Sequence, residues 1–306
     1  MVNEVLWTED GQVDFARVQQ NLRDDGYVVV RNLIPPPEAA RLRSIVETHL
    51  ARKGARYQLG KTQPNAAAHV PDLAFIFQHP RILALFREAF GENAVVFTRH
   101  CDIHRNMVSG WHKDSGESVK GGYFRGDYFA ADDCQVYKVA LYLQDTTPHS
   151  GLTIEPGSHR RSRITGAPKL NLVSQTGDAI LFDVRLSHTG QLPDKIERGM
   201  QLLSAVVNGG HRKKEDLTVI TWLHDMYWRL LGREDRMSAF FTFGVANEFT
   251  RDFAEANLRR QAQQLGETVE SEMGNVRRLA AELSKHGVLT HGVNFGEQDR
   301  VNEPMQ

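Results

Sequence analysis

The short stretch GWHKDSG, residues 110–116, holds an imidazole and a carboxylate two positions apart. In an extended segment, side chains at positions i and i+2 point to the same face. We therefore expect His112 and Asp114 to converge on one point while Lys113 points away. A strand end of this kind offers two ligands to a metal ion, and the rest of the chain must supply a third.

The best third ligand among thirteen histidines is His188. It stands at the exit of the run GDAILFDVRLSHTGQ, where Ile, Leu, Phe and Val after a Gly-Asp turn indicate a buried strand. Two neighbouring strands of a barrel would place His112, Asp114 and His188 on one inner face. Two histidines and one carboxylate form the ligand set of non-haem Fe(II) oxygenases, which leaves coordination positions open for a co-substrate and oxygen.

A cationic anchor is offered by Arg198, in the run KIERGMQLLSAVV, which we expect to enter the next strand. A guanidinium at that position could hold a dicarboxylic acid through a bidentate pair of hydrogen bonds. This chemistry is coherent, because iron binds a 2-oxo acid through its keto and carboxylate oxygens. The far carboxylate of the acid then needs a fixed positive charge.

The elements that must position these residues are helices around a central all-β region. Apolar residues at helical spacing mark 13–25, and prolines open a second helix over about 35–52. Between about 94 and 210, short strand-like runs alternate with Gly, Pro, Asp and Ser, a pattern that favours a β-sandwich or barrel. From about 214 to 290 the pattern is helical again. The sequence therefore predicts a single domain over residues 1–306.

The C-terminal helical region carries an apolar stripe at spacings of three and four residues. We expect this stripe to pack on the body of the protein, and a homodimer contact through these helices is the alternative. The stripe consists of Leu258, Ala262, Leu265, Val269, Met273, Val276, Leu279 and Leu283.

The composition is that of an ordinary soluble globular protein. Hydrophobic residues make up 41% of the 306 residues, and 37 Lys and Arg nearly balance 38 Asp and Glu. A net charge of −1 gives little electrostatic support to nucleic-acid binding. No apolar run approaches a membrane span, and the N-terminal stretch MVNEVLWTEDG lacks the pattern of a secretory signal. We expect a cytoplasmic protein whose two cysteines are reduced thiols.

The ordered set of these motifs resembles the phytanoyl-CoA dioxygenase superfamily over roughly residues 14–210. The set comprises DDGYVVVRNLIPPPEAARLR, the His-x-Asp pair, SGLTIEPGSHR and GDAILFDVRLSHTG with an arginine after it. The resemblance implies an Fe(II)/2-oxoglutarate-dependent oxygenase on a double-stranded β-helix core, of the jelly-roll or cupin-like kind. It implies iron at His112, Asp114 and His188, and the 2-oxoglutarate carboxylate at Arg198.

The function implied by the resemblance is oxidation of a C–H bond, most simply hydroxylation, in a small molecule. The reaction would consume O2 and 2-oxoglutarate and release succinate and CO2, and the substrate would belong to secondary metabolism. Desaturation, cyclisation and epoxidation stay open as outcomes. Two other functions stay open as well: a metal-dependent jelly-roll isomerase or hydrolase, and a jelly-roll that binds a small molecule without catalysis.

Two polar residues on strand-like runs are further candidates for contact with 2-oxoglutarate or substrate. Lys138 lies in the apolar run QVYKVALYL, where a lysine is costly unless it is paired or faces a wet cavity. For Lys138 an edge position facing water is the interpretation that we favour. His104 stands on the strand that leads into the site and alternates inward with Asp102. For His104 we favour a structural polar role over contact with a ligand.

The stretch SGESVKGGYFRGDYFAADD, residues 115–133, separates Asp114 from the next strand. Its glycines supply mobility, and its aromatic residues could enclose a substrate. This make-up is typical of an active-site lid, and an ordinary exposed loop is the alternative. The aromatic candidates are Tyr123, Phe124, Tyr128 and Phe129.

Overall fold

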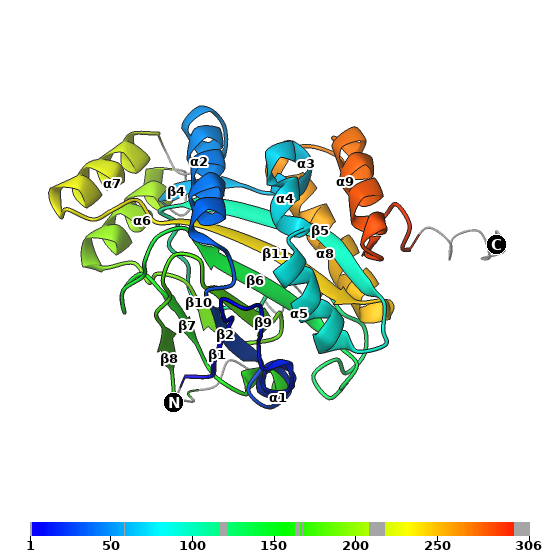
Figure 1. The fold of residues 1–306 in the computed structure, drawn as a ribbon. Coiled ribbons are helices and arrows are strands. Elements are labelled where there is room, and N and C mark those ends of the chain that lie inside the picture. The colour runs from blue at the N-terminus through cyan, green and yellow to red at the C-terminus, as the bar shows by residue number, and fades with distance from the viewer. Residues whose placement is uncertain are drawn as a thin grey trace.

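A computed structural model describes residues 2–57, 59–116, 122–162, 166, 168–207 and 218–296 of the chain. Two β-sheets lie face to face, and helices cover the outer face of the larger sheet (Figure 1). The expected mainly-β core with flanking helices is confirmed. No helix within the described ranges is long and apolar enough to cross a membrane.

The larger sheet has nine strands in the described part of the chain and is mostly antiparallel. Only β1 with β2 and β12 with β5 pair in parallel there. In spatial order its strands are β1 (Glu4–Leu6), β2 (Tyr27–Arg31), β9 (Ala179–Asp183), β6 (Val136–Tyr142), β11 (Met237–Val245), β5 (Val95–Arg105), β4 (Gly60–Gln63) and β3 (Ala55–Tyr57), with β12 (Leu289–Thr290) beside β5.

The smaller sheet is antiparallel and short. It consists of β10 (His188–Thr189), β7 (Leu152–Ile154) and β8 (Leu170–Leu172), in that order. Its apolar side chains pack against Ala140 and Tyr142 of β6 and Phe182 of β9. This inner core holds β10, and therefore His188, opposite the larger sheet.

The helices are α1 (Phe15–Asp24), α2 (Pro36–Arg52), α3 (Ala66–His69), α4 (Ala74–Phe77), α5 (Pro80–Phe90), α6 (Lys195–Val207), α7 (Thr218–Leu230), α8 (Glu248–Leu265) and α9 (Met273–Lys285), with short 3₁₀ turns at Pro71–Leu73 and Ser158–Arg160. Residues from α1, α2, α5 and α9 form the outer core against the larger sheet. Alternation along β6 links the two cores, because Val139 and Leu141 face the helices while Ala140 and Tyr142 face the smaller sheet.

The expectation that Arg198 enters a strand is wrong, because residues 195–207 form helix α6. The helix begins at a reciprocal capping box. The Asp194 carboxylate accepts a hydrogen bond from the backbone N–H of Glu197, and the Glu197 carboxylate accepts one from the backbone N–H of Asp194. These two bonds favour helix over strand at this position.

The expectation of a purely helical region over about 214–290 is also wrong. It contains α7, α8 and α9, but β11 lies between α7 and α8 and occupies a central place in the larger sheet, between β6 and β5. The aromatic residues of MSAFFTFGV favour this strand. The physical reason for the miss is that a strand in mid-sheet needs partners that are far away in the sequence.

The apolar stripe of the C-terminal helices is buried within the chain itself. Val276, Leu279 and Leu283 of α9 and Leu258 and Ala262 of α8 are each less than a tenth exposed. The interpretation that the stripe packs on the body of the protein is therefore confirmed for these residues. They offer no free surface to a second copy of the chain.

Candidate functional site

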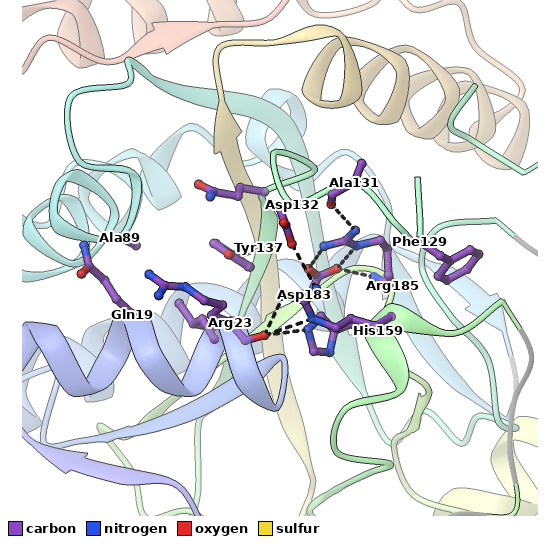
Figure 2. A pocket seen from close by; sticks show the side chains of 13 residues that line it. Gln19, Arg23, Ala89, Phe129, Ala131, Asp132, Tyr137, His159, Asp183 and Arg185 are labelled. Atoms are coloured by element: carbon purple, nitrogen blue, oxygen red, sulfur yellow. Dashed lines mark hydrogen bonds and ion pairs between the residues drawn. The ribbon is translucent and has the colours of Figure 1, made fainter. Parts of the chain in front are cut away.

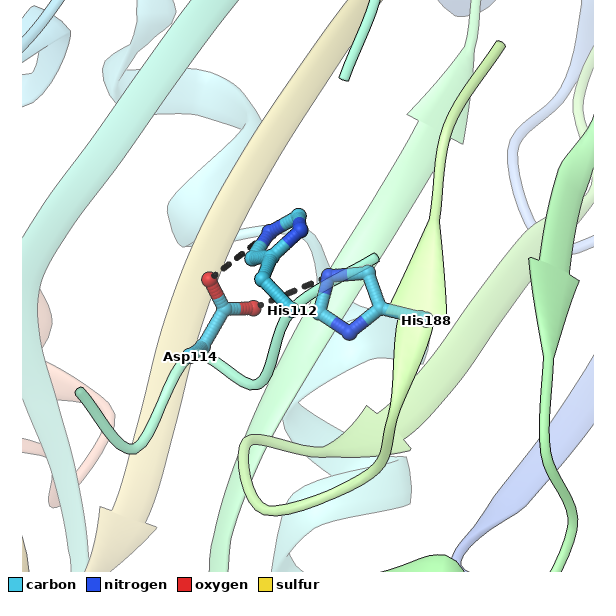
Figure 3. Close-up of side chains that lie close together, drawn as sticks. All are labelled: His112, Asp114 and His188. Atoms are coloured by element: carbon cyan, nitrogen blue, oxygen red, sulfur yellow. Dashed lines mark ion pairs between the residues drawn. The ribbon is translucent and has the colours of Figure 1, made fainter. Parts of the chain in front are cut away.

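Three side chains that the sequence singled out converge in space, as Figure 3 shows. One ligand atom from each of His112, Asp114 and His188 lies within 4.8 Å of the others. The two Asp114 oxygens lie 3.8 Å from His112 Nε2 and 3.4 Å from His188 Nε2. The His188 side chain is 6% exposed and that of His112 is 40% exposed, so the group opens to solvent on the His112 side.

The backbone places these side chains by direct pairing. His112 and His188 are antiparallel partners, and each donates its N–H to the carbonyl of the other, at 3.0 and 2.9 Å. Pairing continues to Ser115, whose N–H donates to the Val184 carbonyl at 3.0 Å. The chain between these contacts carries Asp114 toward the two histidines. The predicted convergence is therefore confirmed, and metal binding itself stays a prediction.

Backbone carbonyls fix the tautomer of both imidazoles. His112 Nδ1 lies 2.8 Å from the Gly110 carbonyl oxygen, and His188 Nδ1 lies 2.9 Å from that of Leu186. Because a carbonyl oxygen only accepts, each Nδ1 carries the proton and donates it. The lone pair is then on Nε2, the atom that faces Asp114 in both residues. This is the arrangement in which a neutral histidine ligates a metal.

The charge state of the cluster suits a cation. Burial alone would raise the pKa of Asp114, but the Lys138 ammonium and the two imidazoles hold it well below its ordinary value. Burial, together with the neighbouring His112, lowers the pKa of His188 to about 3. Asp114 is therefore ionised and His188 neutral at pH 7. One carboxylate and the Nε2 atoms of two histidines are a donor set that fits ferrous iron.

Lys138 lies beside this cluster rather than at a sheet edge. Its ammonium is 2.6 Å from Asp114 Oδ2, and the residue is 7% exposed. The alternative of an edge position facing water is wrong, because β6 runs between β9 and β11. The ion pair with Asp114 supplies the partner that a lysine in an apolar strand requires. Contact with 2-oxoglutarate or substrate stays a prediction.

His104 lies on the same face of the larger sheet. It is opposite Ser238 of β11, which in turn is opposite Tyr142 of β6, so the three residues form one row across the sheet. Burial lowers the pKa of His104 to about 4, so the imidazole is neutral at pH 7. Its Nδ1 is buried without a hydrogen-bond partner among the described residues.

Arg198, expected as the anchor, lies on the exposed side of α6. Its Nε donates a hydrogen bond to the Pro193 carbonyl at 3.1 Å. Residues 163–165, 167 and 208–217 fall outside the described part of the chain, so they enter no statement about this site. Within the described part, a different arginine, Arg236, lies beside the backbone that follows His188.

That arginine is Arg236, which the sequence reasoning missed. It precedes β11, is 6% exposed and donates through Nη1 to the Met107 carbonyl at 2.8 Å. A Cβ at Gly190 would come within 3.0 Å of Arg236 Nη2, so the guanidinium packs against the backbone two residues beyond His188. The sequence held one signal: an arginine directly before an aromatic, strand-like run.

Unpaired polar atoms surround this guanidinium. Arg236 Nε and His104 Nδ1 are buried without a hydrogen-bond partner among the described residues, whereas the Tyr142 hydroxyl interacts with the Arg236 side chain. The Arg236 guanidinium lies 5.4 Å from the centre of the Tyr142 ring. Buried polar groups without partners cost free energy. A ligand with an anionic, hydrogen-bonding end would satisfy them.

The aromatic residues predicted as a lid form a buried cluster with α8. Phe124 and Tyr128 are 4% and 8% exposed, and both pack with Phe249 and Phe253. Tyr123 and Phe129 are partly buried against the same cluster. These contacts attach the segment to α8. Residues 117–121 of the predicted lid lie outside the described residues, and a lid stays a prediction.

A separate cavity of about 400 Å³ lies between α1 and the segment that follows β9 (Figure 2). Its lining includes Arg23, Tyr137 and His159, with the ion pair Asp183–Arg185 at 2.7 Å. None of the three converging residues lines it. The cavity is therefore distinct from the cluster of His112, Asp114 and His188.

Comparison with protein families identifies one match. A model of the phytanoyl-CoA dioxygenase (PhyH) family matches residues 22–191, more than half of the chain. The matched region contains all three converging residues and ends before both Arg198 and Arg236. No curated protein matches the chain.

Solved structures share the fold at low sequence identity. SnoN, an α-ketoglutarate-dependent non-haem epimerase of nogalamycin biosynthesis, has a TM-score of 0.52 at 17% identity, over 76% of this chain and 83% of its own. HygX from Streptomyces hygroscopicus, solved with nickel and 2-oxoglutarate, has 0.51 at 16%, over 74% and 86%. EctD from S. alaskensis, solved with 2-oxoglutarate and 5-hydroxyectoine, has 0.50 at 18%, over 78% and 79%.

Proposed function

The chain belongs to the phytanoyl-CoA dioxygenase family, and on that premise we propose that it is an Fe(II)- and 2-oxoglutarate-dependent oxygenase of a small molecule. The observation that carries the proposal is the convergence of two imidazole Nε2 atoms on one ionised carboxylate. Both imidazoles are held in the metal-ligating tautomer by backbone carbonyls. Membership of the family and the set of two histidines and one carboxylate both favour Fe(II).

In this proposal His112, Asp114 and His188 hold the iron. Bound iron, with 2-oxoglutarate and O2, supplies an oxidant able to attack an unactivated C–H bond. The chain contributes the orientation of the ligands: paired backbone segments fix His112 opposite His188, and their Nδ1–H groups stay bonded to carbonyls. Such outer contacts keep a ligand in its binding geometry.

We assign the far carboxylate of 2-oxoglutarate to Arg236 in place of Arg198. Arg236 is buried beside the backbone that follows His188, whereas Arg198 is exposed on α6. The unpaired His104 Nδ1 and the Tyr142 hydroxyl belong to one row across the larger sheet and would supply further polar contacts. A charge-assisted contact of this kind is worth about 1.5–3 kcal/mol.

The reaction outcome is the finer part of the proposal. Hydroxylation is the simplest outcome, with a secondary metabolite as substrate and succinate and CO2 as co-products. SnoN shares the fold and is described as an epimerase, so product analysis must look beyond hydroxylation. The position of the substrate carbon, rather than the fold, would decide between the outcomes.

The first experiment is an anaerobic titration of purified protein with Fe(II) and 2-oxoglutarate, followed through the weak visible band of the chelated complex. Wild type should form the band, and His188→Ala should not. Arg236→Ala should need about 10–100-fold more 2-oxoglutarate, which is the loss of one charge-assisted contact. Arg198→Ala is the matched control and should titrate like wild type.

Three results would count against the proposal. If wild type binds iron but never forms the chelate, the enzyme does not use 2-oxoglutarate, and an isomerase or hydrolase on the same fold becomes the better candidate. If His188→Ala keeps the band, the metal lies elsewhere. If Arg198→Ala weakens 2-oxoglutarate binding while Arg236→Ala does not, the anchor has been misassigned.

A further inference from the structure

The helices α6 and α7 pack on each other at one end of the molecule, at the left of Figure 1. They lie between His188 and Arg236 in the sequence. Ten of the thirteen strongly exposed large hydrophobic residues in the described part of the chain belong to this pair. We call the surface that they form the α6–α7 face: Ile196, Leu202, Leu203, Val206, Val207, Val219, Trp222, Met226, Leu230 and Leu231.

On each helix the exposed apolar residues recur at helical spacing. Val219, Trp222, Met226 and Leu230 are three or four positions apart along α7 and form one stripe. Trp222 is 59% exposed and Leu230 is 78% exposed. In a surface helix of a monomer the apolar stripe faces the core, so a stripe that faces outward lacks its partner.

The opposite, buried side of the pair carries polar residues beside the apolar Ile220 and Trp228, which are each 3% exposed. Glu197 of α6 and His224 of α7 have no exposed surface, and His224 Nε2 lies 3.0 Å from Glu197 Oε1. Trp228 Nε1 donates to the same oxygen at 2.8 Å. Burial alone would raise the pKa of Glu197, but these hydrogen bonds and one from the Asp194 backbone lower it. The pair thus buries a hydrogen-bonded charged group while ten of its large apolar side chains stay exposed.

The sequences that adjoin the described ranges near this face and at the C-terminal end are polar. The sequence between the two helices, residues 208–217, reads NGGHRKKEDL, and the C-terminal sequence 297–306 reads EQDRVNEPMQ. Both are predominantly polar, so neither supplies enough apolar side chains to cover ten large ones. No residue in the described ranges covers these ten side chains.

We propose that the α6–α7 face is the contact surface between two copies of this chain. A twofold contact uses the same surface on both subunits and needs no second complementary patch. This chain fits that requirement, because most exposed large hydrophobic residues of the described part belong to one helix pair, and only Leu6, Val173 and Leu192 lie elsewhere. Two helices from each copy would form a four-helix contact.

The size of the face suits a stable dimer. Ten large side chains, most of them about half exposed or more, present on the order of 1,000 Å² of surface. A standard interface buries roughly 800 Å² on each partner, and the largest apolar patch of a monomer is usually about 300–600 Å². Trp and Met are also enriched in interface cores, and the face contains Trp222 and Met226.

The dimer contact has a consequence for the proposed site, although it does not depend on the proposed function. The α6–α7 pair is part of the connection between His188, on β10, and Arg236, before β11. A partner copy that packs on α6 and α7 would hold this connection in place. The dimer would then form with or without iron and 2-oxoglutarate.

The test measures mass in solution by sedimentation equilibrium or light scattering, in the absence of metal. Wild type should be a dimer at micromolar concentration. The double variant Leu202→Glu/Trp222→Glu, with one exposed residue from each helix, should raise the dimer dissociation constant by more than ~100-fold and give a monomer. Leu6→Glu changes an exposed leucine outside the face and should leave the dimer intact.

Folding is checked separately by circular dichroism, which should not change because both substituted residues are exposed. A wild type that is monomeric throughout overturns the proposal. So does a dimer that survives the double variant. In a third arm, the protein is sedimented with anionic phospholipid vesicles. A monomer that binds vesicles through Leu202 and Trp222 would show that the face contacts a membrane surface, and this too overturns the dimer.

Discussion

Lys113 stands between two proposed iron ligands in the sequence, yet its side chain points the opposite way. It is 4% exposed, and its ammonium donates hydrogen bonds to the carbonyls of Ser158 at 2.5 Å and Arg185 at 2.7 Å. Arg185 lies shortly before His188. The lysine therefore ties the segment of His112 and Asp114 to the segment that leads to the third ligand.

We predict that Lys113→Met weakens iron binding without removing a ligand. Methionine keeps the apolar stem but loses the donors, so two buried carbonyls lose a partner and the ligand segments can shift. Loss of an outer contact of this kind lowers metal affinity by about 10–100-fold. Anaerobic Fe(II) titration measures the affinity, and denaturant unfolding should show a loss of about 1–3 kcal/mol.

Lys285→Met is the control, because Lys285 is an exposed lysine paired only along its own helix. The Lys285→Met variant should keep the wild-type iron affinity and the wild-type free energy of unfolding. If Lys113→Met lowers stability but leaves iron affinity at the wild-type value, the lysine is a structural support only and does not position the ligands.

At the residue scale, the sequence could identify the converging triad but not the buried arginine near it. His112 and Asp114 share a face by the simple alternation of an extended segment, and His188 follows a recognisable buried strand. Arg198 follows His188 closely in the sequence, but the Asp194–Glu197 capping box makes its run helical. Arg236 is brought to the site by sheet pairing that no local pattern encodes.

At the scale of elements, α8 packs on β11 through a glycine. A Cβ added at Gly244 would lie 2.2 Å from Thr250 Oγ1 and 2.8 Å from its Cγ2, so the strand and the helix touch here. The same helix carries Arg260, which pairs with Asp102 of β5 at 3.2 Å. The close approach at Gly244 thus helps to set how α8 lies against the inner face of the larger sheet.

We predict that Gly244→Ala lowers the free energy of unfolding by roughly 1–3 kcal/mol, the usual cost of overpacking. Thr250→Ala should relieve much of this in the double variant, because it removes the atoms that clash and Thr250 Oγ1 has no hydrogen-bond partner among the described residues. Denaturant unfolding of the four proteins measures the coupling, expected at about 1 kcal/mol or more.

Gly274→Ala is the matched control, since Gly274 lies on α9 with no atom within 4 Å of an added Cβ. Alanine should there raise stability slightly, by about 0.5 kcal/mol, because it favours helix more than glycine does. Equal effects of the two glycine substitutions would mean that the contact between Gly244 and Thr250 does not limit how α8 packs.

At the scale of the whole molecule, the sequence predicted the architecture better than the connections. Repeated short apolar runs indicate a β-sandwich, because the apolar residues of each run reflect the burial of that strand. The place of β11 in mid-sheet and the helical pair between His188 and Arg236 depend on contacts far apart in the chain. Such long-range contacts form only in the folded molecule, so short sequence patterns indicate them weakly.

The proposed site draws its residues from both sheets, so binding there should stabilise the whole fold. His112 and His188 pair at the smaller sheet, whereas Lys138 and Arg236 belong to strands of the larger sheet or their ends. A ligand that binds only the folded state at about 100 times its dissociation constant adds about 2.7 kcal/mol of stability. For a chain of this size we expect the melting temperature to rise by about 5 °C.

We predict that the rise comes in two steps, measured by anaerobic thermal unfolding with Fe(II) alone and then with 2-oxoglutarate added. Wild type should show both steps, because each ligand adds its own binding free energy to the folded state. Arg236→Ala should keep the first step and lose most of the second, while His188→Ala should lose both. An equal rise in wild type and His188→Ala would mean that the metal stabilises the protein from another position. In that case the chain would bind iron at a position other than His112, Asp114 and His188, although it would still belong to the family.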